Sequence, residues 1–342
     1  MALSMLMRGA EDETYDQIAN ALLIAGIKEV DNMREQALLM RHLMSREDVT
    51  LTSANSIWHH ERLTAADDYK EQISQYYGAE IAAVNFTNSE TPLRINNWVS
   101  EQTKGKIEQI VPDKISEDTF MYLINALYLQ AEWRDPFQAE RTTEQPFELP
   151  SGEIVQVPMM NQEEVLPAYD GDAVRAVRLG LGQSSKLSMT LILPHEGKSW
   201  PEVRREIEGD WKDAFTNYTV NVTLPKFKIE QELSLNESFQ VLGMEAMFNK
   251  QEAQLGRMAG WDVAAGPNLY VDEALQKTYL EIDEEGLEAA AVTSIAVMIT
   301  SGMMDPPEPM TLVFDRPFYF LIEDVESGAV LFIGAINDPH GE

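Results

Sequence analysis

The chain has 342 residues, no Cys and 44% hydrophobic residues, and its 57 acidic and 26 basic side chains give a formal net charge of −31. This length and apolar content can supply a substantial core for one large domain. The acidic excess argues against nucleic acid, anionic membranes and heparin-type activators as partners, because these need clustered Lys and Arg.

The predicted elements mix helices and strands, with strands dominating after about residue 140. Residues 120–129 are apolar on both faces, which is typical of a strand in the middle of a sheet. The expected helices are 2–8, 14–25, 29–45, 64–77, 93–111, 200–208, 235–241 and 250–254. The expected strands are 50–58, 120–129, 145–149, 153–160, 174–179, 187–194, 219–230, 311–322 and 329–336. No repeat or linker divides the chain, so we expect one α+β domain over 1–342.

The first ten residues carry an apolar run that leads directly into an acidic loop. This run has no small-residue cleavage site, so we interpret it as the end of a core helix and not as a signal peptide. Localisation therefore stays open.

The stretch from Gly286 to Ser301 contains conflicting local signals. With a period of two, one face is small or apolar throughout, as in a strand, yet Gly286 and the Pro-rich run 305–309 delimit it like a loop. The alternatives are a short helix, with Leu287, Ala291 and Ile295 on one stripe, or an ordinary strand before a turn. Conflicts of this kind tend to occur at functional sites.

The usual signatures of enzymes and metal sites are incomplete in this sequence. The run 180–184 lacks the last Gly of a nucleophile elbow, and the His pair at 59–60 lacks the spacing of a zinc site. Residues 283–286 are too short for a calcium loop. We therefore expect no catalytic residues, no metal and no cofactor.

Ten consecutive residues closely resemble the proximal hinge of inhibitory serpins. They are Glu284, Glu285, Gly286, Leu287, Glu288, Ala289, Ala290, Ala291, Val292 and Thr293. Other segments that are similar to serpins follow in family order at 95–99, 103–107, 125–129 with Trp133, 157–160, 191–194, 224–227, 242–244, 314–318 and 331–334. The resemblance covers essentially the whole chain.

This resemblance implies a fold of three β-sheets and about eight helices, with a reactive-centre loop at about 284–310. A serine protease would cut the loop and form an acyl-enzyme, and the cut loop would then insert into the largest sheet. The protein would act as a suicide inhibitor, without cofactor and as a monomer. The alternative is a non-inhibitory serpin acting as a carrier, chaperone or storage protein, or a mere protease substrate.

The family's spacing from Gly286 places the scissile bond at Thr300–Ser301, which suits an elastase-like pocket. Met303 or Met304 is the alternative and favours chymotrypsin-like proteases; subtilisin-like proteases are further candidates. Side chains that enter the sheet must be small or apolar, as Ala289, Ala291 and Thr293 are. Leu287 is larger than the small hydroxyl residue usual there, so we expect slower insertion.

The region that would part to admit the loop contains Asn125, Trp133 and Gln276. Gln276 replaces a His found in many members, and its amide can still donate to and accept from Asn125. The chain also begins inside the family's second helix, so a shortened member or a late start is expected. The composition is compatible with a prokaryotic origin, and an extracellular or periplasmic location is the weak expectation.

Overall fold

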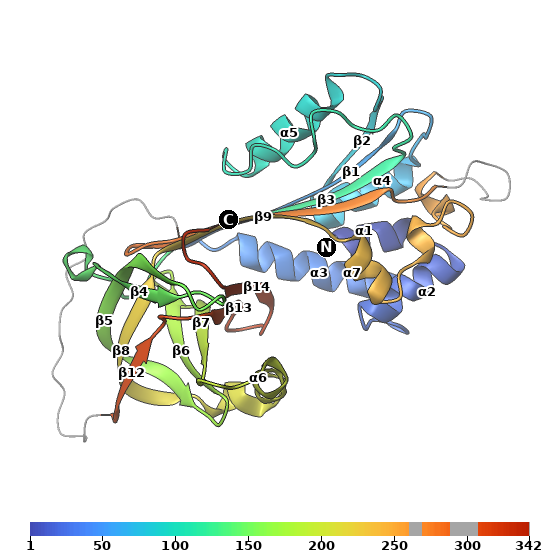
Figure 1. Cartoon of the computed structure of the whole chain (residues 1–342). Helices are drawn as coiled ribbons and strands as arrows, with labels where there is room; N and C mark the ends of the chain where they lie inside the picture. Colours follow the sequence, from blue (N-terminus) through green and yellow to red (C-terminus); the bar gives the residue numbers. More distant parts are fainter. Residues whose placement is uncertain (260–268, 288–306, 342) are drawn as a thin grey trace. The chain divides into compact units, whose positions relative to one another are not determined.

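The computed structural model describes residues 1–259, 269–287 and 307–341 (Figure 1). Backbone contacts divide the chain into two compact units, one with residues 1–46, 51–128 and 230–279, the other with 47–50, 129–229 and 280–342. Strands β1 (Val49–His60), β3 (Met121–Glu132), β9 (Phe227–Ser234) and β10 (Glu273–Ile282) each contribute residues to both units. We therefore retain the single domain as a hypothesis.

The first unit is built on most of a six-stranded sheet. Its strand order is β2-β1-β3-β11-β10-β9, where β2 is Glu80–Val84 and β11 is Gly286–Leu287. The α-helices of this unit are α1 (Ala2–Gly9), α2 (Asp12–Ala21), α3 (Glu29–Met44), α4 (Asp67–Tyr77), α5 (Thr91–Gln102) and α7 (Asn236–Val241). Short 3-10 helices lie at Ala246–Phe248 and Gly256–Met258.

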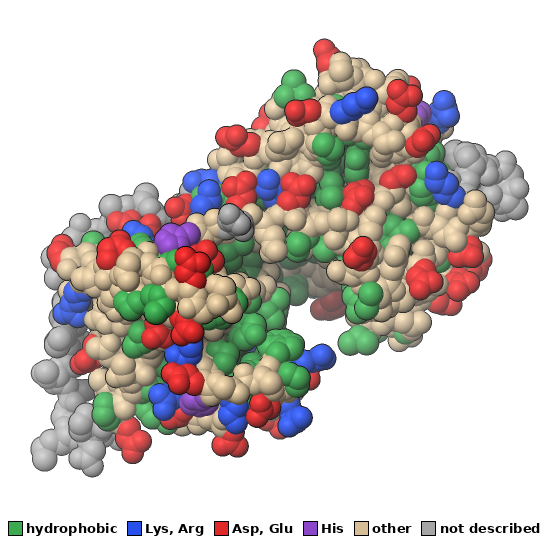
Figure 2. All heavy atoms as spheres, viewed as in Figure 1, with side chains coloured by type: hydrophobic (Ala, Val, Ile, Leu, Met, Phe, Trp, Pro, Cys, Tyr) green, Lys and Arg blue, Asp and Glu red, His purple; other side chains and the backbone are tan. Residues whose placement is uncertain are grey.

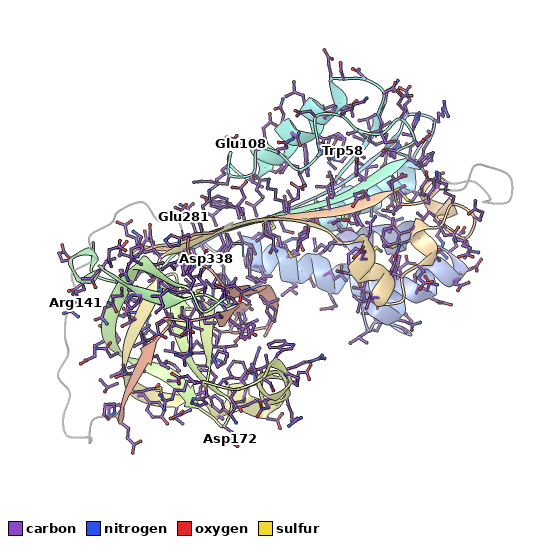
Figure 3. All side chains as sticks on the ribbon, viewed as in Figure 1. Trp58, Glu108, Arg141, Asp172, Glu281 and Asp338 are labelled. Atoms are coloured by element: carbon purple, nitrogen blue, oxygen red, sulfur yellow. The ribbon has the colours of Figure 1, made fainter. Side chains whose placement is uncertain are left out.

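Both faces of this sheet are covered, because consecutive side chains on a strand point to opposite sides. Ile57 and Leu123 belong to a core shared with α1, α2 and α4, while their neighbours Trp58 and Ile124 belong to a second core under α5. Figure 1 shows α5 on one side of the strands and α1 and α2 on the other. Trp58 lies on the side of the sheet that faces α5 (Figure 3). Strand 120–129 was expected to be buried on both faces, and it is.

The second unit contains an eight-stranded sheet ordered β12-β8-β5-β6-β7-β13-β14, with β4 also paired to β5. Its strands are β4 (Thr143–Glu148), β5 (Ile154–Asp170), β6 (Val174–Leu181), β7 (Leu187–Pro194), β8 (Thr216–Pro225), β12 (Pro309–Val313), β13 (Phe318–Asp324) and β14 (Val330–Ile336). Helix α6 (Trp200–Ile207) and 3-10 helices at Ala139–Arg141 and Asp210–Ala214 complete the unit.

Two hydrogen-bonded sheets are present in the described residues where three were expected. The reason is strand β5, whose 17 residues pair first with β4 and β8 and then, from Ala168 onward, with β6. One continuous strand thereby joins what would otherwise be two separate sheets. The described residues hold seven α-helices, close to the expected eight.

Several expected boundaries are wrong for local reasons. The helix expected at 93–111 ends at Gln102, because Lys104 and Gly105 adopt left-handed φ values of 54° and 80°. Residues 250–252 form a turn, not the start of a helix, and Asn249 Oδ1 accepts from the Gln251 N–H there. The strands expected at 219–230 and 311–322 are each two strands, interrupted near Pro225 and Pro317.

The surface is acidic over both units. On the face shown in Figure 2, Asp and Glu side chains are widely spread, with Lys and Arg scattered among them. Among the described residues, no helix is long and apolar enough to cross a membrane.

Candidate functional site

A tight turn reverses the chain between β10 and β11. The Asp283 carboxylate accepts hydrogen bonds from the backbone N–H groups of Glu285 (2.9 Å) and Gly286 (3.1 Å). The N–H of Asp283 in turn donates to the Gly286 carbonyl at 3.0 Å. A side chain that mimics a backbone turn in this way holds the reversal in one conformation.

Trp133 and Phe137 bind three carbonyl groups of this turn, those of Asp283, Glu284 and Glu285. The Trp133 indole donates to the Asp283 carbonyl at 2.9 Å, and its backbone N–H donates to the Glu285 carbonyl at 2.8 Å. The Phe137 N–H donates to the Glu284 carbonyl at 2.9 Å. Trp133 is buried and packs edge-on against the Phe137 ring at 5.9 Å. These contacts anchor the start of the candidate loop.

The side chain of Glu284 forms a charged anchor beside the turn. Its carboxylate accepts from Lys226 Nζ at 2.8 Å and from the Thr142 hydroxyl at 2.7 Å. Burial alone would raise the pKa of this carboxyl, but the hydrogen bonds from Lys226 and Thr142 outweigh burial and hold the pKa below its ordinary value. Glu284 is therefore ionised in the folded protein at neutral pH.

Gly286 occupies a position that only glycine fits. Its φ is +143°, and a Cβ there would lie 2.3 Å from the Ala131 carbonyl oxygen and 2.6 Å from the Trp133 nitrogen. The next residue, Leu287, is completely buried and pairs with Ala131 of β3 and Ile282 of β10. The backbone therefore enters the sheet at Gly286.

The two strands on either side of β11 pair directly with each other farther along. β3 and β10 run parallel through seven residue pairs, from Tyr122 opposite Glu273 to Tyr128 opposite Tyr279. Near the ends of these strands β11 lies between them, antiparallel to both. The sheet is thus closed by direct pairing of β3 with β10 along most of this seam, and only its end admits β11 between them.

A chain of amides crosses this seam in the first unit. Gln276 Nε2 donates to Asn125 Oδ1 at 3.0 Å, and Asn125 Nδ2 donates to Asn55 Oδ1 at 2.9 Å. Asn55 in turn donates to the carbonyl and hydroxyl of Ser53. Gln276 therefore makes the contact with Asn125 that its amide was expected to make, and Asn55 extends the chain to a third side chain.

The structure places only part of the expected site. Glu284, Glu285, Gly286 and Leu287 lie together with Trp133, and Asn125 and Gln276 are bonded to each other. The remaining expected residues lie outside the described residues: Glu288, Ala289, Ala290, Ala291, Thr293, Thr300, Ser301, Met303 and Met304.

Sequence reasoning missed the supporting residues of the site. From the sequence, Asp283 belongs only to an incomplete calcium motif and Lys226 only to a segment similar to serpins, while Thr142 has no distinguishing feature. The one sequence signal for this ion pair was Lys226, a basic residue directly after Pro225 in an acidic chain. This signal does not show which of the 57 acidic residues is the partner of Lys226.

Comparison with known proteins identifies the class. The family model described as "Serpin (serine protease inhibitor)" matches residues 1–339. Human serpin B9 is 30% identical over 99% of this chain and 90% of its own length. The leukocyte elastase inhibitor of Xenopus laevis has the same identity and the same coverage of both chains. The crystal structure of a thermophilic serpin, tengpin, in the native state is 32% identical with a TM-score of 0.87, covering 98% of this chain and 86% of tengpin.

The chain belongs to the serpin family. Serpins are protease inhibitors and not enzymes, in agreement with the expectation from the sequence. The family's targets are serine proteases.

Proposed function

We propose that this chain inhibits serine proteases as a suicide substrate, by inserting the cleaved segment after β11 between β3 and β10. The observation that supports this most directly is β11 itself. Two residues of the loop already occupy the space between β3 and β10, and beyond them these strands pair only with each other across the seam. The residues that follow β11 could extend its pairing with β3 and β10 along this seam.

The register of β11 predicts where each following residue would go. Each step forward in the loop corresponds to one step back on β3 and on β10. Ala289 would then lie opposite Leu129 and Leu280, which are both buried. Thr293 would lie opposite Asn125 and Gln276, where its hydroxyl can bond with the amides that insertion separates.

Insertion would replace one ladder of hydrogen bonds with two. The net gain is one ladder of about ten residues, because the direct pairing of β3 with β10 is lost. At about 1 kcal/mol net per hydrogen bond, this gives on the order of 10 kcal/mol. That value is comparable with the whole stability of a typical domain, about 5–15 kcal/mol. The uncut chain would therefore be a kinetic trap that cleavage releases.

The target would be an elastase-like, chymotrypsin-like or subtilisin-like serine protease. The relative named leukocyte elastase inhibitor supports the first of these classes. We place the reactive bond at Thr300–Ser301, with Met303 or Met304 as the alternative. In this proposal the chain acts as a monomer, without a cofactor or a heparin-type activator, in an extracellular or periplasmic setting.

The test is incubation with elastase, chymotrypsin, subtilisin and trypsin, followed by a denaturing gel. We expect a covalent band larger than either partner with at least one of the first three proteases. Mass spectrometry of the released C-terminal peptide identifies the cut bond. Cleavage without such a band from any protease would contradict the proposal and favour a non-inhibitory serpin.

Two adjacent substitutions separate insertion from cleavage. Ala289→Arg would place a charge between Leu129 and Leu280, which costs several kcal/mol when buried and unpaired. Glu288→Arg would lie opposite Gln130 and Glu281, which are both partly exposed. We expect Ala289→Arg to be cleaved without forming the complex, whereas Glu288→Arg still forms it. Equal behaviour of the two variants would exclude this register.

A further inference from the structure

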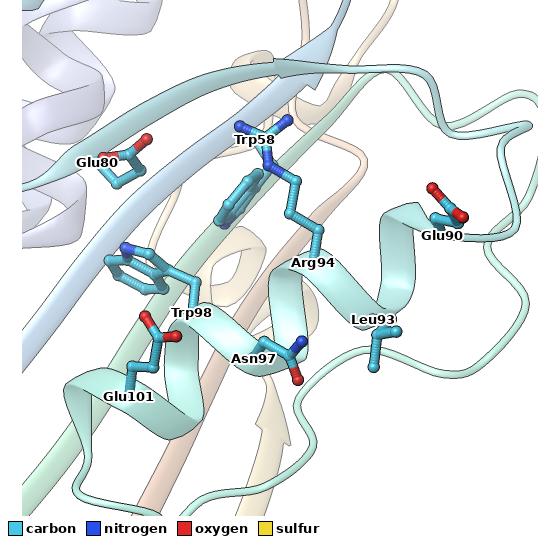
Figure 4. Close-up of a pocket in the computed structure, with 8 residues that line it drawn as sticks. All are labelled: Trp58, Glu80, Glu90, Leu93, Arg94, Asn97, Trp98 and Glu101. Carbon is cyan, nitrogen blue, oxygen red and sulfur yellow. The ribbon is translucent and has the colours of Figure 1, made fainter.

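A cavity of about 520 Å³ lies between α5 and the strands β1 and β2 in the first unit (Figure 4). It is separate in sequence from the loop site, since it shares no residue with the hinge or with the amide chain across the seam. Helix α5 supplies most of its lining, Trp58 comes from β1 and Glu80 from β2. Its size is in the range of cavities that hold small organic ligands.

Two indole rings form adjacent walls of this cavity. The rings of Trp58 and Trp98 have their centroids 6.0 Å apart and their planes at 77°. The Arg94 guanidinium lies 5.4 Å from the centroid of Trp58. Because the face of an indole is electron-rich, it attracts cations. Arg94 thus shows that one indole wall of the cavity already carries a cation.

The lining has an excess of negative charge. The lining contains three carboxylates, those of Glu80, Glu90 and Glu101, and one positive side chain, Arg94. Its formal charge is therefore −2. Within the described part of the chain, no side chain forms a hydrogen bond or an ion pair with these three carboxylates. In Figure 4 the carboxylates of Glu80 and Glu101 lie on opposite sides of the Trp98 indole. A cation at Trp98 would therefore be attracted by the indole ring and by both carboxylates.

The geometry points to a binding site for a small organic cation, an ammonium group on a short alkyl chain, held at Trp98 between Glu80 and Glu101. The ammonium contacts the indole face and the carboxylates, and the alkyl chain contacts the aromatic walls. An anion would be repelled by the carboxylates. A neutral polar ligand would not be attracted by the indole faces as a cation is.

The test is titration of the full-length protein with n-butylammonium by calorimetry, with 1-butanol as the neutral counterpart. Ionic strength is kept near 0.01 M, where the Debye length is about 30 Å and charge effects are largest. Glu80→Gln and Glu101→Gln should each weaken binding by about threefold. Arg94→Gln should strengthen it by about threefold, because this change frees the Trp58 face and makes the lining more negative. N-acetyl-lysine methylamide then tests whether a lysine side chain can supply the same group.

The matched control is Glu35→Gln, which removes one exposed charge from α3 and does not touch the cavity. Binding should be unchanged in this variant. The proposal is overturned if Glu35→Gln weakens binding as much as Glu101→Gln, since the amine would then respond only to the net charge of the protein. It is also overturned if 1-butanol binds as well as butylammonium, or if Arg94→Gln weakens binding.

Discussion

Among the described residues of the hinge, Glu284 is the charged side chain with the most hydrogen-bond donors around it. It combines a half-buried position with two donors, Lys226 and Thr142, and its backbone carbonyl is bound by Phe137. The acyl-enzyme of the proposed mechanism would pull on the chain directly after this residue. An anchor at Glu284 would keep the start of the loop in register while the rest moves.

The stabilisation by Glu284 should depend on pH. Its pKa in the folded protein lies below the ordinary value, so the stabilisation is fully present above about pH 5 and is lost as the pH falls through the folded-state pKa. We expect Glu284→Gln to lower the free energy of unfolding by about 1 kcal/mol at pH 7. The difference from the unmodified protein should shrink below about pH 4.

Urea denaturation at a series of pH values measures this difference. Glu144→Gln on β4 is the control, because Glu144 is exposed and forms no ion pair among the described residues. A difference for Glu284→Gln that stays constant from pH 7 to pH 3 would show that the carboxylate's charge contributes nothing.

The structure accommodates Leu287 better than the resemblance to serpins suggests. By resemblance its size should slow insertion. In the structure its side chain is fully buried between β3 and β10, so the folded protein accommodates this size at the first position. The effect on the rate of insertion remains a prediction.

At the level of elements, the side chain of Asn96 holds α5 to the segment that follows it. Asn96 Oδ1 accepts from the N–H groups of Ile110 (2.9 Å) and Val111 (3.0 Å), and its Nδ2 donates to the Val111 carbonyl at 3.0 Å. Ile110 and Val111 are both buried. Without Asn96 the N–H groups of Ile110 and Val111 would lose their acceptor, and water has little access to replace it. The Val111 carbonyl would keep Gln109 Nε2 as a donor, at 3.2 Å.

We therefore expect Asn96→Ala to lower the free energy of unfolding by about 3 kcal/mol, because a buried polar group without a partner costs about 1–3 kcal/mol. The neighbouring Asn97 is exposed, so Asn97→Ala should change stability by less than about 0.5 kcal/mol. Chemical denaturation of both variants provides the comparison. Equal effects would mean that the hydrogen bonds of Asn96 do not stabilise α5.

For the whole molecule, the proposed function predicts that cutting the loop makes the protein more stable. About 10 kcal/mol of added stability, divided by an unfolding entropy of about 2.1 cal/mol/K for each of 342 residues, corresponds to a rise in Tm of roughly 14 °C. Calorimetry before and after limited cleavage between residues 299 and 305 measures it. Nicked Ala289→Arg should lack the rise, and an unchanged Tm in the unmodified protein would exclude insertion.

Much of the fold was accessible from the sequence because its signals are local. Strand 120–129 is apolar on both faces, and the helices near the N-terminus repeat their apolar residues at helical spacing. The ends of elements were less accessible. Helix α5 ends early because Lys104 and Gly105 turn left-handed, and for Lys104 composition gives no warning of this.

The sequence by itself determined the class of protein and the small side chains at 289, 291 and 293, since both follow from residue types read along the chain. Only the tertiary structure decided that Glu284 pairs with Lys226, that Asp283 closes the turn, and that β11 enters between β3 and β10. These contacts join residues up to 156 positions apart (Leu287 and Ala131). Each partner is one choice among many similar side chains in the chain. Local patterns carry no information about such choices, because packing of the whole chain selects them.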